Sequence, residues 1–299
     1  MPEEMSPCPP PNEIDELPVV RSVAHFSDLS HASEIAFAHA LAIALVWRSR
    51  LDILHIDRGA NADWSRFPAV RRVLERWGLL APGSERAAVY RELEVAVQKI
   101  QLDGNPVRRM LEYVQTHRPD LIVFASEGRT GIGRLRAPSV AETVFRRSRT
   151  MTLFVREGGR PFVALADGHL SIQRILVPVD EKPDATEAIA RATRAAELLG
   201  DAPVEITLLH VGGGTFPAYP KPEPRLTSDG TVERWRWHER RREGVVAEEI
   251  LAEAGESSAD LIVMATDGRD GVLDAFRGSF TEQVVRRAPC PVLAVPAFS

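Results

Sequence analysis

Apolar residues along the chain alternate between short continuous runs and stretches of helical period. In the second half, residues 174–180 form an apolar run that leads into a polar turn, which predicts a buried strand. Pro183 and Asp184 then signal the start of a helix. Its predicted buried face, which ends before Gly200, consists of Ala185, Ala188, Ile189, Ala192, Ala196 and Leu199. A second predicted strand follows at residues 204–211.

The first half repeats this order, although the middle segments differ. Residues 21–28 and 51–56 predict strands, and the alanine-rich residues 31–47 between them predict a helix. Residues 64–93 predict two short helices, including one over residues 67–77. At the corresponding place in the second half, residues 212–230 are rich in glycine and proline and predict a loop, and residues 231–238 alternate like a strand.

Two segments of nearly the same sequence show that the chain is a duplication. Residues 119–131 read PDLIVFASEGRTG, and residues 259–271 read ADLIVMATDGRDG. Each is followed at the same distance by Ser-x-x-Glu, which begins at Ser139 in the first copy and at Ser279 in the second. A pair of arginines and a short apolar strand close each copy. Such self-similarity predicts two copies of one structural unit.

The order of elements in each unit predicts the fold class. Each unit reads strand, helix, strand, variable segment, helix, strand, glycine loop, helix, strand. This alternation predicts an α/β protein of two tandem doubly wound, Rossmann-like domains, each with a parallel sheet between two layers of helices. In such sheets a ligand binds at the carboxyl ends of the strands, where the strand order reverses. The predicted parts are a disordered tail at 1–17, a first domain at 18–157, an extended connector or hairpin at 158–171 and a second domain at 172–299.

Composition narrows the classes of protein. The 299 residues, 44% of them hydrophobic, suit two domains with a core each. A net charge of -5 argues against a dedicated nucleic-acid binder, and we interpret the arginines at 146–147 and 240–242 as solvated faces. The two cysteines, Cys8 and Cys290, indicate no disulfide framework. Without a signal peptide or an apolar run of roughly 20 residues, we expect a cytoplasmic protein with no membrane partner.

The repeated unit resembles the universal stress protein family over nearly the whole chain after the tail, once in each half. The family's pattern is a first strand ending in Pro-x-Asp and a later loop of Gly-x2-Gly-x9-Gly-Ser/Thr. In the ATP-binding members the aspartate faces the adenosine part, and the loop holds the phosphates. Glycines let the backbone approach phosphates closely, and the N–H groups at the start of the next helix favour anions.

The resemblance also implies how the two units associate. The fold implied is adenine-nucleotide-hydrolase-like. In the family the last strands of two units pair, so residues 152–155 should pair with residues 291–295 to form an internal pseudo-dimer. Further association into a homodimer is left open, and no protein partner is indicated.

The second half matches the family's binding pattern better than the first. The candidate site for an adenine nucleotide is Pro178, Asp180, Val211, Ala265, Gly268, Gly278 and Ser279. Ala265 stands where the family has its first glycine. Asp267 places a carboxylate beside the loop, where it would repel phosphate unless it points away or binds through a cation. The candidate ligand is therefore ATP with Mg²⁺, or another adenine nucleotide.

The first half departs further from the pattern. Its weaker candidate residues are Asp28, Gly128 and Ser139. Phe26 replaces the family's proline, and Pro138 replaces the last glycine of the loop. Proline has no N–H to offer a phosphate, so we expect this site to be degenerate and its motif to be kept for folding.

Purely structural roles would explain the same residues. Asp28 and Asp180 would cap the helices that follow them, and the loop glycines would make tight turns. Ser139 and Ser279 would be N-caps, completed as capping boxes by the glutamates three residues later, Glu142 and Glu282.

Catalytic motifs are missing. The sequence has no Gly-x-Ser-x-Gly elbow, phosphate-binding Gly-x4-Gly-Lys-Ser/Thr loop or His-Glu-x-x-His pair, so we expect no enzyme, or at most a slow ATPase. His55 and His210 end apolar strands and are expected to be satisfied core or crevice residues. His238 lacks a convincing set of metal-ligating partners, and Cys290 is expected to be buried packing.

Two functions therefore stay open. The first is a stress-response protein that binds ATP or another adenine nucleotide, or a related small molecule, in the second half. The second is an interaction or scaffold protein that binds no nucleotide and presents surfaces such as the proline-rich residues 219–224.

Overall fold

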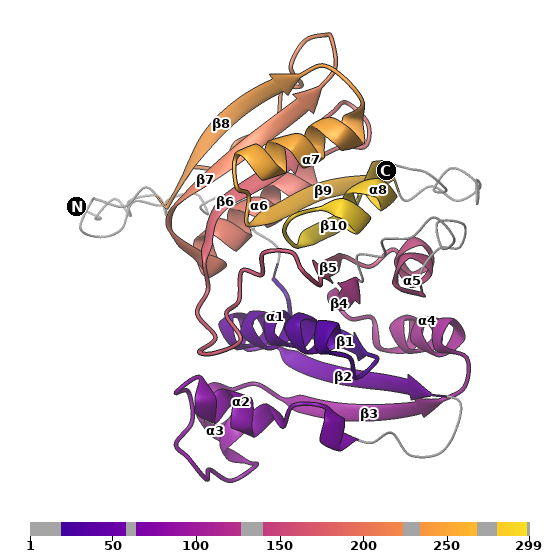
Figure 1. Cartoon of the computed structure of the whole chain (residues 1–299), viewed down its shortest axis with the longest axis vertical. Coiled ribbons are helices and arrows are strands. Elements are labelled where there is room, and N and C mark those ends of the chain that lie inside the picture. Colours follow the sequence, from indigo (N-terminus) through magenta and orange to yellow (C-terminus); the bar gives the residue numbers. More distant parts are fainter. Residues whose placement is uncertain (1–18, 58–63, 127–139, 224–233, 268–279, 298–299) are drawn as a thin grey trace, which may run out of the picture.

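The computed structural model describes residues 19–57, 64–126, 140–223, 234–267 and 280–297. These residues form one sheet of ten strands in the order β3-β2-β1-β4-β5-β10-β9-β6-β7-β8 (Figure 1). The strands are β1 (Ser22–Ser27), β2 (Arg50–Asp57), β3 (Val97–Asp103), β4 (Leu121–Ser126), β5 (Thr152–Arg156), β6 (Ile172–Pro178), β7 (Gly200–Val211), β8 (Trp235–Arg242), β9 (Leu261–Asp267) and β10 (Val292–Ala297). The helices are α1 (His31–Trp47), α2 (Val70–Arg76), α3 (Ala88–Leu93), α4 (Pro106–His117), α5 (Val140–Ser148), α6 (Thr186–Leu199), α7 (Val246–Glu256) and α8 (Phe280–Arg287), with a 3-10 turn η2 (Trp64–Arg66).

The strand order confirms two doubly wound units in tandem. Within each half every pair of neighbouring strands is parallel, and the chain reverses its direction along the sheet after the second crossover. The halves meet where β5 and β10 pair antiparallel, with Leu153 opposite Leu293. The predicted pairing of the closing strands is thus confirmed. Because this pair is antiparallel, the carboxyl ends of the strands in the two halves point to opposite edges of the sheet.

Alternation along the strands builds a core on each face of the sheet. Val23 of β1 belongs to the cluster beneath α1 and α6, and Ala24, the next residue, belongs to the cluster beneath α4, α5, α7 and α8. Each cluster contains residues of both halves, such as Leu153 and Val295 in the first. The prediction of helices on both faces is confirmed, and the two units share their cores.

Local sequence sets the helix starts. The hydroxyl of Ser30 accepts a hydrogen bond from the Ser33 N–H at 3.2 Å and caps α1. Asn105 caps α4 in the same way, with Pro106 in the first turn, where its missing N–H costs nothing. At α6 the carboxylate of Asp184 accepts from the Thr186 N–H at 2.7 Å, as the sequence signal indicates.

The connector between the halves is held against the first half. Val163 and Leu170 form an isolated antiparallel bridge within the predicted connector. The indole of Trp77 donates to the carbonyl of Leu165 at 3.2 Å. Gly168 lies against the same ring with a left-handed backbone (φ 73°), and a Cβ there would come within 2.4 Å of the ring. Glycine is therefore required at this position.

The structure adds one strand to the variable segments and changes the bounds of another. Residues 97–103, predicted neither as helix nor as strand, form β3 at the edge of the sheet beside β2. The strand alternates polar and partly buried side chains, a weaker signal than the continuous apolar runs of the inner strands. The strand predicted at residues 231–238 is β8, which begins at Trp235 and continues to Arg242; residues 231–233 lie outside the described part. The two short helices after residue 64 are present as α2 and α3.

The interpretation of residues 240–242 as a solvated face is wrong for one of them. Arg240 and Arg241 are exposed, but the guanidinium of Arg242 pairs with three carboxylates of α7. It contacts Glu253 at 2.7 Å, Glu249 at 3.4 Å and also Glu256. These carboxylates lie three or four residues apart along α7, so they face Arg242 together and tie β8 to the helix.

The halves are also joined by an ion pair. Arg286 of α8 donates to both carboxylate oxygens of Glu142 on α5, at 2.7 and 2.9 Å, and contacts Glu282 of its own helix at 2.7 Å. The proposed domain boundaries and the tail at 1–17 stay predictions. Among the described residues there is no helix long and apolar enough to cross a membrane.

Candidate functional site

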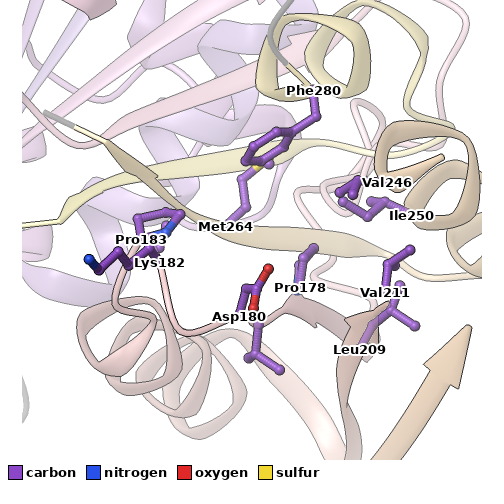
Figure 2. A pocket seen from close by; sticks show the side chains of 12 residues that line it. Pro178, Asp180, Lys182, Pro183, Leu209, Val211, Val246, Ile250, Met264 and Phe280 are labelled. Carbon is purple, nitrogen blue, oxygen red and sulfur yellow. The ribbon is translucent and has the colours of Figure 1, made fainter. Parts of the chain in front are cut away.

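A cleft opens in the second half at the carboxyl ends of β6, β7 and β9, beside α7 and the start of α8 (Figure 2). This is the point where strand order reverses, because β6 is followed by β7 on one side and lies beside β9 on the other. The cleft encloses about 510 Å³, including space open to solvent. Its lining residues are Pro178, Val179, Asp180, Lys182, Pro183, Leu209, Val211, Val246, Ile250, Met264, Ala265 and Phe280.

Asp180 places a carboxylate at the bottom of this cleft. It follows β6 by two residues, and its side chain is 58% exposed. One carboxylate oxygen accepts from the Glu181 N–H at 2.8 Å, and the same oxygen lies 4.0 Å from Nδ1 of His210. Figure 2 shows the carboxylate directed into the cleft toward Met264. Asp180 therefore retains hydrogen-bond acceptor capacity for a ligand.

A tyrosine from a distant loop fixes the backbone on which Asp180 sits. The hydroxyl of Tyr219 donates to the carbonyl oxygen of Asp180 at 2.5 Å and accepts from the Ala185 N–H at 3.1 Å. The phenol thus bridges the two ends of the turn between β6 and α6. Burial is the largest cause that raises the pKa of Tyr219, so the phenol stays protonated and able to donate at neutral pH.

The loop that carries Tyr219 is itself attached to β8. The indole N–H groups of Trp235 and Trp237 each donate to the carbonyl of Pro222 at 3.1 Å, and Lys221 forms an ion pair with Glu239. The described part of the proline-rich segment is therefore held at the site and is not a free docking arm.

The remaining walls of the cleft are apolar. Val246 and Ile250 lie one turn apart on α7 and face Met264, with the ring of Phe280 above them. Lys182 and Pro183 close the other end of the cleft (Figure 2). Asp180 and Lys182 carry the only ionisable side chains among the described residues that line the cleft. Such a space suits a flat apolar group with a polar edge.

Histidines at the ends of the second strands are structural in both halves. Nδ1 of His210 lies 3.3 Å from the carbonyl of Val179, and Nδ1 of His55 lies 2.8 Å from the carbonyl of Ser27. A carbonyl oxygen only accepts, so Nδ1 is the donor in each case. The expectation of satisfied crevice residues is confirmed for both histidines.

In the first half, two aromatic side chains occupy the equivalent positions. The rings of Phe26 and Phe124 stack with their centroids 5.3 Å apart, and each side chain is 4% exposed. They stand at the positions of Pro178 and Met264 in the duplicated sequence. The degeneracy of the first site stays a prediction, because Gly128, Pro138 and Ser139 lie outside the described residues.

The aspartates do not cap the following helices, so that alternative is wrong. The N-cap of α1 is Ser30, and Asp28 accepts from its N–H at 2.9 Å and from its hydroxyl at 2.6 Å. In the second half Asp184, not Asp180, bonds the first turn of α6. Asp28 orients a cap, whereas Asp180 is available to the cleft.

The structure brings together four of the predicted second-half residues, Pro178, Asp180, Val211 and Ala265. The others, Gly268, Gly278 and Ser279, lie outside the described residues, as do Gly128 and Ser139 of the first half, so the two capping boxes stay predictions. Sequence reasoning missed Tyr219 and the apolar walls from α7 and α8. The spacing of Val246 and Ile250 is a helical signal, but it does not show which strands the helix covers.

Two further side chains carry potentially reactive groups. Cys290 is 1% exposed, and burial raises the pKa of its thiol to about 12, which confirms that it is packing. His238 pairs with Glu205 on the neighbouring strand. Within the described residues, no three histidine, cysteine or acidic side chains are grouped as a metal site would need.

Comparison with known proteins agrees with this architecture. The profile of the Universal stress protein family matches residues 26–156 and 236–296. The chain belongs to the universal stress protein family. The two matched regions fall in the two halves, as expected for a tandem member.

Individual relatives match shorter segments. A universal stress protein of Methanocaldococcus jannaschii is 45% identical over 66 residues, which cover 21% of this chain and 39% of the relative. One of Thermus aquaticus is 51% identical over 53 residues, 18% of this chain and 39% of the relative. The matched segments thus span well under half the length of these relatives.

Solved structures resemble the chain over nearly its whole length. A universal stress protein of Archaeoglobus fulgidus has a TM-score of 0.59 at 19% identity, with 92% of this chain and 98% of that one covered. A functionally unknown protein of Pseudomonas aeruginosa also has a TM-score of 0.59, at 17% identity and 93% coverage of both chains. These likenesses support the universal stress protein fold for both halves.

Proposed function

We propose that this member of the universal stress protein family is a stress-response protein that binds an adenine nucleotide in its second half. The observation that carries the proposal is the cleft beside Asp180, which is apolar except for that carboxylate and Lys182 among its described lining residues. A purine ring fits between the apolar walls, and a carboxylate accepts hydrogen bonds from ribose hydroxyls or a purine amino group.

The family resemblance supplies the rest of the proposed ligand. It assigns the phosphates to Gly268, Gly278 and Ser279, with Mg²⁺ to offset the nearby negative charge. Asp180 and the walls from α7 and α8 would then bind the adenosine part, while Tyr219 keeps Asp180 in place from the side of the loop.

Calorimetric titration with Mg-ATP, ADP and AMP tests the proposal. Asp180→Ala should weaken binding roughly 10- to 100-fold, because a hydrogen bond to a charged group contributes about 1.5–3 kcal/mol. Ala265→Leu, which narrows the cleft, should also weaken it. Asp28→Ala is the matched control in the first half and should leave affinity unchanged.

A second variant separates the role of the loop from that of the carboxylate. Tyr219→Phe removes the bridging hydroxyl but keeps the ring, so affinity should fall severalfold while Tyr90→Phe, at an exposed tyrosine, has no effect. Two results together would replace this proposal with the interaction-protein alternative. No nucleotide would be released from the freshly purified protein, and Mg-ATP would give no heat of binding and no change in melting temperature.

A further inference from the structure

A second groove lies on the other face of the sheet, between the two halves. It runs between α1 and α6 over the junction of β5 and β10, and it encloses about 480 Å³, including space open to solvent. Trp47 and Phe162 border it, Leu153 and Leu293 form part of its floor, and Arg191 and Arg194 of α6 stand at one side. We refer to it as the inter-half groove. It is separate from the cleft beside Asp180, because the two share no lining residue.

The lining of the inter-half groove is apolar apart from the two arginines. All its other described residues are aliphatic, aromatic or methionine. Binding sites for small organic molecules combine such walls with a few placed polar groups, and they occur preferentially where two domains meet. The groove has both properties.

The arginines hold hydrogen-bond donors that the protein does not use. Arg191 donates through Nε to Glu187 at 2.8 Å, but its Nη1 is buried without an acceptor. Arg194 donates through Nη1 to Glu197, and its Nε is buried without an acceptor. Each side chain is only about one-fifth exposed, at 19% and 20%. A buried guanidinium N–H with no partner is unfavourable, and an oxygen anion is the partner it matches best.

Arg194 of α6 also contacts the wall of the groove that α1 forms. Its guanidinium carbon lies 5.0 Å from the centre of the Trp47 ring on α1, a cation–π contact with the opposite wall. A rotation of the two guanidinium groups would bring their unpaired N–H groups to an anion bound in the groove.

From these contacts we infer that the inter-half groove binds an amphiphilic monocarboxylate, with its alkyl chain against the apolar floor and its carboxylate on Arg191 and Arg194. The alkyl chain removes apolar surface from water, and the carboxylate supplies acceptors to the unpaired Nη1 of Arg191 and Nε of Arg194. Neither interaction depends on a nucleotide in the other cleft.

Equilibrium dialysis of the full chain against labelled decanoate, below the concentration at which it forms micelles, tests this inference. One decanoate should bind per chain and saturate. The double variant Arg191→Met and Arg194→Met keeps the length of the side chains but removes the donors, and it should bind at least about tenfold more weakly. Arg91→Met, at an exposed arginine of α3, is the control and should bind as the parent does.

A further variant and a cationic amphiphile complete the test. Ala195→Phe narrows the groove and leaves both arginines, so it should also lose binding; circular dichroism shows that each variant is folded. Decyltrimethylammonium has the same chain with a cationic head and should not bind. Binding that is not saturable, that survives in the double variant, or that is equal for the cationic amphiphile overturns the inference, and so does association of the chain into dimers that covers the groove. Mg-ATP should not displace decanoate, so this result stands or falls apart from the nucleotide proposal.

Discussion

Single exchanges at equivalent positions distinguish the two halves. Phe26 stacks on Phe124 and is buried, whereas Pro178 lines an open cleft. Phe26 therefore adds a stacked aromatic pair to the core of the first half. Asp28 and Asp180 differ in the same sense, since the first orients a helix cap and the second faces a space that can hold a ligand.

Two buried histidines predict how stability depends on pH. His25 and His39 are fully buried, and burial lowers the pKa of each from 6.5 to about 4. The unfolded chain therefore takes up protons at a higher pH than the folded one, so this contribution to stability is complete above about pH 6.5 and declines as the pH falls to about 4. Each histidine accounts for roughly 3 kcal/mol at most over that range.

Urea unfolding of variants measures this linkage. His39→Leu should lose less stability between pH 7 and pH 5 than the parent, because one proton-linked group is gone and its unsatisfied Nε2 is removed. His31→Gln, at an exposed histidine, should keep the parental pH dependence. An unchanged slope in His39→Leu would show that this imidazole is not held neutral by burial.

The ion pair between α5 and α8 joins the two halves, and its removal should lower the stability of the folded chain. Arg286→Met should destabilise the chain by roughly 1–3 kcal/mol, since Glu142 is largely buried and loses both bonds to the guanidinium. Arg287→Met breaks an exposed pair with Glu248 on the neighbouring helix and should destabilise the chain much less, because solvent screens this pair. Equal effects in chemical unfolding would contradict the assignment of Arg286 as a junction residue.

Elements also differ in how well sequence defines them. The inner strands β4 and β9 contain continuous apolar runs at residues 121–124 and 261–265 that are buried on both faces, and their pattern predicts them. The edge strand β3 contains Gln98, Lys99 and Gln101, and it is a strand because the backbone of β2 offers it hydrogen-bond partners. That pairing is a property of the assembled sheet and not of the segment.

At the scale of the whole molecule, the shared cores predict one unfolding unit. Each hydrophobic cluster contains residues of both halves, and β5 pairs directly with β10. Trp47, Trp64 and Trp77 lie in the first half, and Trp235 and Trp237 lie in the second. In a variant that keeps the tryptophans of one half only, tryptophan fluorescence therefore reports on the unfolding of that half. We expect the urea midpoints of these variants to coincide with each other and with the midpoint measured by circular dichroism. Separate midpoints would show that the halves unfold independently.

The sequence by itself determined the duplication, the parallel α/β fold, the pairing of the closing strands through the family resemblance, and Pro178, Asp180, Val211 and Ala265 as neighbours. It could do so because strand and helix periods, and the place of a residue at a strand end, are local properties that every doubly wound unit uses alike.

Only the tertiary structure decided what surrounds those residues. Tyr219 reaches Asp180 from 39 residues away, Phe26 stacks on Phe124, and Arg194 contacts Trp47 across the junction of the halves. None of these contacts follows from a local period, because each depends on where separate elements are packed. The open cleft beside Asp180 and the inter-half groove both result from such packing.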